Sequence, residues 1–184
     1  LQAKRASAPA QINIPRDFWT QVVDIELPAI VEFERPSGGE DAVNEAAELL
    51  SKAEFPVLLN GAGVVIGGAI EASIKLAERL DAPVCCGYQH NDAFPGSHPL
   101  FAGPLGYNGS KAGMELIAKA DVILALGTRL NPFSTLPGYG IDYWPKDAKI
   151  IQVDINADRI GLTKPVSVGI VGDARKVALS IIDK

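Results

Sequence analysis

The sequence predicts an α/β protein built on a doubly wound, mostly parallel sheet of five or six strands with helices on both faces. From residue 40 onward, short apolar runs alternate with amphipathic helical patterns, and a glycine-rich turn follows the first run. The runs are apolar throughout instead of at every second position, so each strand must be covered on both faces. These three observations together are typical of a Rossmann-like domain.

The elements alternate regularly after residue 39. Apolar spacing predicts a helix over residues 40–53, a strand over 56–60, a helix over 67–80 and a strand over 83–87. A helix over 110–120, capped by Ser110, follows, and then come strands over 121–127 and 148–154. A short helix near 157–161, a strand over 166–171 and a helix over 174–182 complete the chain. Residues 88–109 and 131–149 are predicted to be long loops, which are commonly functional or form interfaces.

The first 39 residues are expected to form a separate part of the chain. Residues 11–14 resemble a strand ended by Pro15, and residues 20–39 contain Pro28, Pro36 and a Ser-Gly-Gly end without a sustained period. A lone strand needs a pairing partner. We therefore expect residues 1–39 to be the tail of a preceding domain plus a linker, and residues 40–184 to form a nucleotide-binding-like domain.

Composition excludes several classes of function. The chain has 184 residues, 47% of them hydrophobic, and a formal net charge of −5. It has no basic block for nucleic acid, no run long enough to span a membrane and no hydrophobic leader, so a cytoplasmic protein is expected. Cys85 and Cys86 are adjacent and would point to opposite faces of a strand, so we interpret them as buried apolar residues, with a reactive thiol as the less favoured alternative.

The glycine turn reads NGAGVVIGG and leaves two interpretations open. Gly61 and Gly63 have the spacing of the first two glycines of a dinucleotide fingerprint, but Gly67 comes one place late. The second predicted strand ends at Gly87, and Tyr88 and Gln89 follow it, so the acidic residue that binds the ribose of NAD is absent there. The glycines therefore either retain the geometry of a nucleotide site or only permit close packing of a helix against a strand.

Polar residues at other strand ends are candidates for ligand binding. Thr128 and Arg129 lie at the carboxyl end of one predicted strand and Asp154 at that of the next. Asp173 precedes the last helix, where it could equally be an N-cap. His90 and His98 have no partners at metal-ligand spacing, so no metal site is expected. No nucleophile elbow, phosphate loop or Cys-x-x-Cys motif occurs, and the last absence argues against a sirtuin-like deacylase.

An ordered set of phrases resembles the central domain of thiamine-diphosphate-dependent enzymes of the acetolactate synthase group. These phrases are PAQINIPRDFW, FPVLLNGAGV, DAPVCCGYQHNDAFPGSHPLFAGPLGYNGS, ADVILALGTRLNPF, KIIQVDINADRIG and VSVGIVGDA. The wording INIPRDFWTQVVDIELP and GTRLNPFSTLPGYGIDYWP is most similar to acetyltransferase members of the group. The alternatives are an acetolactate synthase-like domain that binds FAD and a free-standing nucleotide-binding module.

The resemblance implies that the catalytic groups lie outside this chain. Such enzymes activate thiamine diphosphate with a Glu in a pyrimidine-binding domain and hold Mg²⁺ with a Gly-Asp-Gly motif and an Asn in a diphosphate-binding domain. Here Gly-Asp-Ala, at residues 172–174, is followed by RKVALS, so the motif is absent. We expect no catalytic residue and no metal ligand in this chain, which would have the two flanking domains as partners in a homo-oligomeric enzyme.

The resemblance also implies where an adenine nucleotide would lie. Gly61, Ala62 and Gly63 would run along its phosphates and Arg129 would lie near the adenosine. The ribose and adenine would contact three further residues, namely Asp154, Ile155 and Asp173. ADP or FAD is the implied ligand, but Arg-Leu-Asn-Pro-Phe replaces the Arg-Phe-Asp-Asp-Arg run of acetolactate synthases, which makes a flavin the less favoured choice.

Overall fold

The computed structural model describes residues 2–6, 8–29 and 33–184, and these fall into two compact units, Leu1–Arg35 and Pro36–Lys184. The predicted tail and linker also include residues 1, 7 and 30–32, which lie outside the described residues.

Among its described residues, the first unit has two short helical segments, and most of the others lie outside helices and strands. The helical segments are α1, Gln2–Ala6, and the 3₁₀ helix η1, Arg16–Thr20. The predicted strand over residues 11–14 is wrong, because these residues are extended but form no β-pairing with any described residue. The described part of the unit is rich in exposed apolar side chains, among them Ile12, Trp19, Val23 and Leu27.

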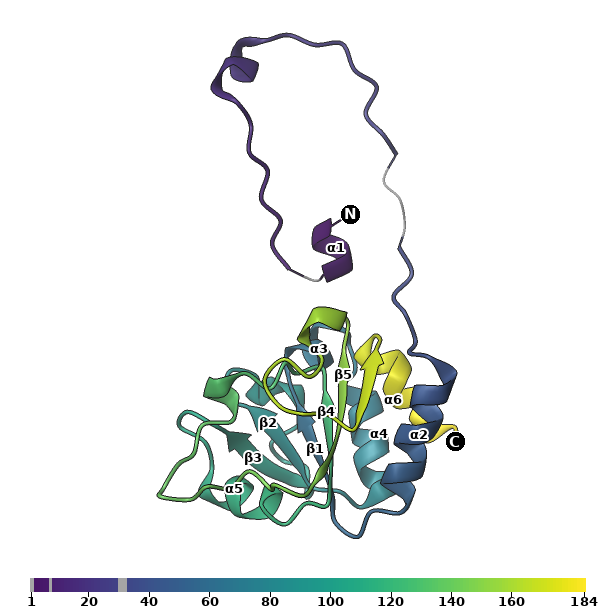
Figure 1. The fold of residues 1–184 in the computed structure, drawn as a ribbon, viewed down its shortest axis with the longest axis vertical. Coiled ribbons are helices and arrows are strands. Elements are labelled where there is room, and N and C mark those ends of the chain that lie inside the picture. Colours follow the sequence, from purple (N-terminus) through teal and green to yellow (C-terminus); the bar gives the residue numbers. More distant parts are fainter. Residues whose placement is uncertain (1, 7, 30–32) are drawn as a thin grey trace. The chain divides into compact units, whose positions relative to one another are not determined.

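The second unit is built on a six-stranded sheet in the order β3-β2-β1-β4-β5-β6, with every neighbouring pair parallel (Figure 1). The strands are β1 Pro56–Asn60, β2 Val84–Gly87, β3 Phe101–Leu105, β4 Val122–Leu126, β5 Lys149–Asp154 and β6 Val168–Val171. This is the strand order of a doubly wound dinucleotide-binding fold. The predicted fold class is confirmed, and of the five or six strands predicted the sheet has six.

Strand β3 lies inside residues 88–109, which were predicted to be a loop, so that part of the prediction is wrong. Its sequence, FAGPL, contains Gly103 at φ +101° and Pro104, two residues that usually mark turns. Both are tolerated because β3 is an edge strand and its pairing with β2 shifts register between Val84 and Cys85.

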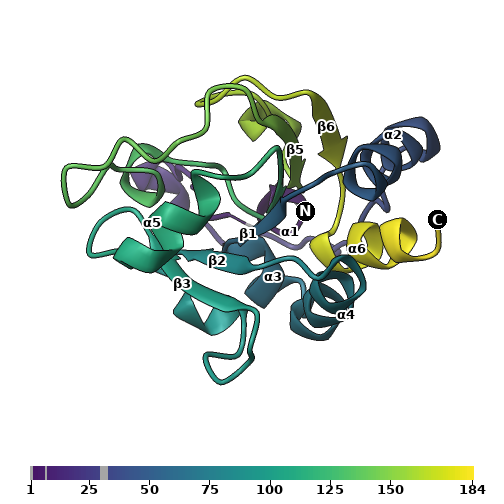
Figure 2. The ribbon, with the colours of Figure 1, turned by 90° about the horizontal axis from the view of Figure 1, so that it is seen from below.

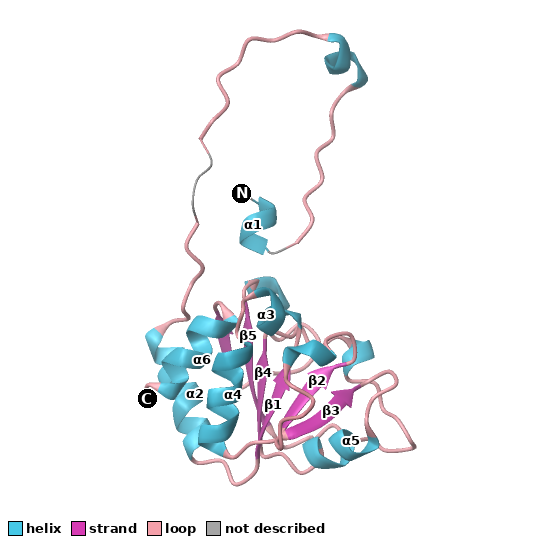
Figure 3. Ribbon diagram, turned by 180° about the vertical axis from the view of Figure 1, so that it is seen from behind, coloured by secondary structure: helices cyan, strands magenta, loops and turns pink. Residues whose placement is uncertain are grey.

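Helices cover both faces of the sheet (Figures 2 and 3). Three helices lie on one face, namely α2 Glu40–Ser51, α4 Ile70–Leu80 and α6 Ala174–Ile182, and α5 Lys111–Ile117 lies on the other. The helix predicted over 67–80 begins later, at Ile70, and a separate short helix, α3 Ala62–Ile66, precedes it. Gly68, at φ +61°, separates the two helices. The short helix predicted near 157–161 is the 3₁₀ helix η4, Ala157–Arg159.

The core has two halves, one on each face of the sheet. Successive strand residues point to opposite faces, so Leu58 packs with the α2, α4 and α6 side while Val57 and Leu59 pack with the α5 side. Cys86 and Cys85 divide in the same way, and both are fully buried, as the sequence predicts. Each buried leucine contributes about 1.5–3 kcal/mol to folding.

The loop predicted over residues 131–149 contains the 3₁₀ helix η3, Pro132–Ser134, and η2, Asn91–Ala93, precedes β3. None of the helices in the described ranges is both long enough and apolar enough to cross a bilayer.

Candidate functional site

The strand order places most of the sequence-predicted residues at the carboxyl edge of the sheet, near the point where its topology reverses, and we call this part of the edge the crevice. From β1 the chain moves outward to β2 and β3 and then returns to β4 on the other side of β1, so the topology reverses between β1 and β4. Ligands of open α/β sheets bind at the carboxyl ends of strands at such a point. Gly61, Ala62 and Gly63 follow β1, and Arg129 lies three residues after the end of β4.

The glycine turn after β1 packs directly on the turn after β4. A Cβ atom on Gly61 would lie 2.5 Å from the Cβ of Thr128, and one on Gly63 would lie 2.6 Å from the Cα of Gly127. The amide of Gly63 donates to the carbonyl of Gly127 at 2.8 Å. The space that these glycines leave is therefore filled by residues 127 and 128, which supports a packing role. The packing joins two turns, whereas the sequence predicts packing of a helix against a strand.

Asn60 fixes the start of the glycine turn. Its buried side chain donates through Nδ2 to Ser73 Oγ at 2.7 Å and to the carbonyl of Ala93 at 3.1 Å. These bonds tie the end of β1 to α4 and η2. The sequence reasoning missed this residue, whose signal was a polar side chain at the end of an apolar strand.

A charged cluster lies at the ends of β4 and β5. Asp154 is half-buried, and its Oδ1 accepts the amide of Asn156 at 2.9 Å. Burial raises the pKa of Asp154 above its ordinary value, while that amide and the positive charges of Arg159 and Arg129 act in the opposite direction. The structure thus brings Asp154 and Arg129 together as candidates and adds Arg159. Ile155 follows Asp154 and is also half-buried.

Gln152 holds the loops that carry this cluster. It is fully buried in β5; its Nε2 donates to the carbonyls of Thr128 and Arg159, both at 3.1 Å, and its Oε1 accepts the amide of Gly161 at 2.9 Å. These three hydrogen bonds all go to backbone of the loops that follow β4 and β5. Sequence reasoning missed Gln152, although one polar residue in the apolar run KIIQVD was the available signal.

Asp173 is an N-cap. It is buried, and its Oδ1 accepts the amides of Arg175 at 3.0 Å and Lys176 at 3.3 Å at the start of α6. This confirms the capping alternative. The other carboxylate oxygen, Oδ2, lies 3.4 Å from where a Cβ of Gly67 would be, so Asp173 also borders the glycine turn.

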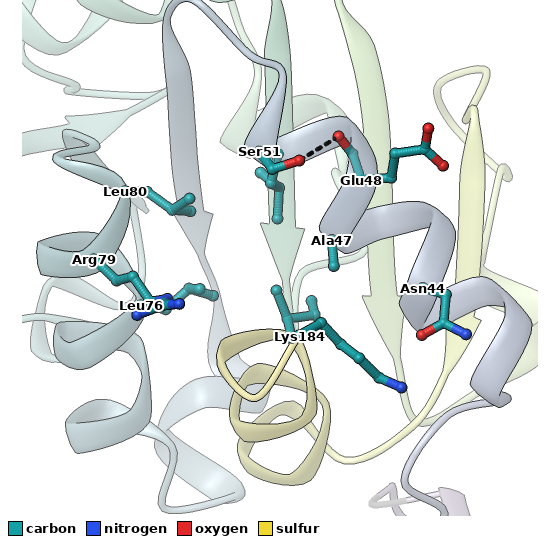
Figure 4. A pocket seen from close by; sticks show the side chains of 10 residues that line it. Asn44, Ala47, Glu48, Ser51, Leu76, Arg79, Leu80 and Lys184 are labelled. Atoms are coloured by element: carbon teal, nitrogen blue, oxygen red, sulfur yellow. Dashed lines mark hydrogen bonds between the residues drawn. The ribbon is translucent and has the colours of Figure 1, made fainter.

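A separate groove lies on the helical face, away from the crevice (Figure 4). It has a volume of about 370 Å³ and is formed by α2, α4, the end of α6 and Lys184 after it. Its lining combines apolar side chains with a few charged ones: Asn44, Ala47, Glu48, Leu50, Ser51, Leu76, Arg79, Leu80, Ile181 and Lys184. None of the predicted site residues lines this groove.

Metal-ligating side chains are dispersed. Within residues 2–6, 8–29 and 33–184, no three His, Cys, Asp or Glu side chains are grouped so that they could hold a metal ion. His98 lies 3.3 Å from Glu78 and packs edge-on against Phe94, and His90 lies 3.7 Å from Asp92.

Comparison with known proteins identifies the family. The model of the family described as thiamine pyrophosphate enzyme, central domain, matches residues 43–181. The chain belongs to this family, as its central domain. This confirms the resemblance seen in the sequence, and the family implies thiamine diphosphate as a cofactor, usually with a divalent metal ion.

Two relatives and one solved structure illustrate the match. The chain is 81% identical to sulfoacetaldehyde acetyltransferase of Roseovarius nubinhibens over 100% of its own length and 30% of the relative. It is 35% identical to a probable acetolactate synthase large subunit of Methanocaldococcus jannaschii over 95% of its length and 30% of the relative. Benzoylformate decarboxylase from Polynucleobacter necessarius has the same fold, with a TM-score of 0.74 and 24% identity over 92% of this chain and 31% of that one. The chain thus spans about 30% of the length of these relatives.

Proposed function

We propose that the chain is the central domain of a sulfoacetaldehyde acetyltransferase. Such an enzyme cleaves sulfoacetaldehyde and transfers an acetyl group to phosphate, producing acetyl phosphate and sulfite. The observation that carries the proposal is the 81% identity to the Roseovarius protein across the whole chain, against 35% to the archaeal acetolactate synthase relative.

We also propose that residues 1–39 are the tail of a pyrimidine-binding domain plus a linker and that residues 40–184 are the central domain. The division into compact units after Arg35 and the start of α2 at Glu40 support this boundary. Homo-oligomerisation of the full-length protein stays a prediction.

The thiamine cofactor and Mg²⁺ would be held by the flanking domains. When bound there, thiamine diphosphate would supply the carbanion chemistry of the reaction. The charged side chains at the crevice are one carboxylate, Asp154, and two cations, Arg129 and Arg159. Mg²⁺ prefers several oxygen ligands. The donor set at this site therefore does not fit a Mg²⁺–diphosphate group.

An assay of the full-length protein tests the activity. With sulfoacetaldehyde, phosphate, thiamine diphosphate and Mg²⁺, acetyl phosphate and sulfite should form in equal amounts, and omission of either phosphate or the cofactor should abolish acetyl phosphate. Formation of acetolactate from pyruvate, without acetyl phosphate from sulfoacetaldehyde, would instead assign the chain to an acetolactate synthase.

For the crevice we propose a structural adenine nucleotide, ADP in preference to FAD. The proposal depends on the charged cluster, because Asp154 can accept from ribose hydroxyls beside Arg129, where the adenosine is expected, and Arg159 can attract phosphate oxygens. The glycine turn contributes less, since the Gly63 amide already donates to Gly127.

Calorimetric titration of ADP, FAD and NAD separates the ligands. ADP should bind, and Asp154→Ala should weaken it while the neighbouring exposed change Asp158→Ala should not. Submicromolar binding of FAD, or ADP binding that Asp154→Ala leaves unchanged, would contradict the assignment. If none of the three binds, the glycines and the cluster serve packing alone.

A further inference from the structure

The groove on the helical face lies where α6 ends (Figure 4). Figure 2 shows α6 between α2 and α4, and α6 packs against both of these helices. Residues 44–51 of α2 line one side of the groove and residues 76–80 of α4 line the other. Ile181 and Lys184, at the end of α6, also line it. The polypeptide therefore arrives at the groove as it leaves α6.

The groove has an apolar floor and a polar rim. Leu50, Leu76 and Ile181 line it and are buried, so they form its floor, whereas Ser51 and Arg79 are exposed at its edge. An apolar centre inside a polar rim is typical of an interface. A segment with one apolar face and one polar face would fit this surface.

Three charged side chains line the groove, and two of them are paired. Glu48 forms an ion pair with Lys52, and the ammonium of Lys184 lies 3.7 Å from the carboxylate of Glu40. Arg79 forms no ion pair with any residue that the structure describes. Its guanidinium can therefore donate to a carbonyl or carboxylate of whatever occupies the groove.

The sequence contains no signal that would end α6. Residues 179–184 include no Gly, Asn or Pro, and the C-cap residue Asp183 keeps helical angles of φ −74° and ψ −9°. By contrast, α4 ends at Asp81, which has a left-handed φ of +48°. α6 has nine residues, against twelve in α2 and eleven in α4, and is thus shorter than they are by about 3–5 Å. The helix can continue past Lys184.

We propose that the residues directly after Lys184 continue α6 by roughly one turn and fill the groove. Position 185 would lie on the buried face of the helix, because it follows Ala178 by seven residues and Ile181 by four. This inference depends on the proposed function, in which a diphosphate-binding domain follows Lys184. The relatives leave room for it, since this chain spans only 30% of their length. The next domain would then be joined through a helix seated on α2 and α4 instead of a free linker.

Cysteine labelling of the full-length protein tests the proposal. Ser51→Cys places a thiol on the α2 side of the groove, and Arg79→Cys places one on the α4 side. The matched controls are Glu45→Cys and Lys75→Cys, because these residues are exposed on the same two helices but do not line the groove. The labelled peptide is identified by mass spectrometry.

Positions 51 and 79 should label at least about tenfold more slowly than positions 45 and 75, since thiol reactivity follows exposure. Lys184→Pro should abolish this difference, because proline removes a helical amide donor and clashes with the preceding turn. Lys184→Ala should keep it. The buried Cys85 should stay unlabelled in both variants, which would show that the domain remains folded.

Hydrogen exchange of the unsubstituted full-length protein is a second readout that does not depend on these variants. In a continuing helix, the first amides after Lys184 donate to carbonyls in the last turn of α6. They should therefore exchange at least about tenfold more slowly than amides of an unstructured peptide. Exchange as fast as in such a peptide would contradict the proposal.

The labelling experiment has further outcomes that would overturn the proposal. One is labelling at positions 51 and 79 as fast as at the controls. Protection that survives Lys184→Pro would assign the groove to another segment, and protection lost on dilution would assign it to a second copy. None of these readouts needs turnover, so a failure of the acetyltransferase assignment would not be mistaken for a failure of this inference.

Discussion

At the scale of single residues, the two turns of the crevice are joined by glycines that have no room for a side chain. Gly63→Ala should lower the free energy of unfolding by about 2–3 kcal/mol, because the new Cβ would meet the Cα of Gly127 at 2.6 Å. The control is Gly96→Ala, where the nearest atom would lie 3.8 Å away. Equal stability of the two variants in urea unfolding would show that the turns do not pack as described.

The adjacent cysteines give a second prediction at this scale. Burial raises the pKa of the Cys85 and Cys86 thiols to about 12, with smaller contributions from Cys86 to Cys85 and from Asp92 to Cys86. Since only the thiolate is nucleophilic, neither should react with a thiol reagent at neutral pH until the domain unfolds. Rapid labelling of either residue in the native protein would restore the reactive-thiol alternative.

At the scale of elements, Asp121 ties the beginning of β4 to the beginning of β1. Its Oδ2 accepts the amide of Glu54 at 2.7 Å and its Oδ1 that of Phe55 at 2.9 Å. Burial acts to raise the pKa of Asp121, but the backbone amides prevail and lower it below its ordinary value of 3.8. The ionised carboxylate therefore stabilises the folded state.

This carboxylate makes part of the stability pH-dependent. A carboxyl group whose pKa is lowered by folding contributes fully above its unfolded pKa and loses that contribution as pH falls through the folded pKa. Asp121→Ala should cost about 1–2 kcal/mol at pH 7. The difference from the unsubstituted protein should shrink below about pH 3.8. The exposed Asp147→Ala is the control, and a difference for Asp121→Ala that stays constant from pH 7 to pH 3 would contradict the account.

The sequence predicts most elements because the strands are covered on both faces. β1 and α6 have the predicted bounds, since Pro56–Asn60 is uniformly buried and Asp173 caps the helix with its own side chain. β3 was not predicted, because Gly103 and Pro104 usually mark turns. A strand tolerates them here because it lies at the edge of the sheet.

The candidate site could be predicted only in outline. Strand ends locate the crevice, so Arg129 and Asp154 were found from sequence and lie together in the structure. The role of Gln152 could not be found in this way, because it bonds to backbone 7 to 24 residues away, and such contacts depend on how the loops fold. The contact between Gly63 and Gly127 also depends on the tertiary fold, so it could not be predicted from sequence either.

At the scale of the whole molecule, the family's fold and the family's chemistry are separable. The sheet, its two-sided core and the crevice are complete within residues 36–184. The thiamine chemistry, in this account, belongs to sequence on either side. The central domain would then contribute a folded sheet domain with one charged crevice for a structural nucleotide.

The most direct test compares residues 1–184 with the full-length protein in one assay, with sulfoacetaldehyde, phosphate, thiamine diphosphate and Mg²⁺. The account predicts acetyl phosphate and sulfite from the full-length protein and none from residues 1–184, even though circular dichroism shows the shorter chain to be folded. Formation of acetyl phosphate by residues 1–184 alone would contradict it, because the catalytic groups would then lie inside this chain.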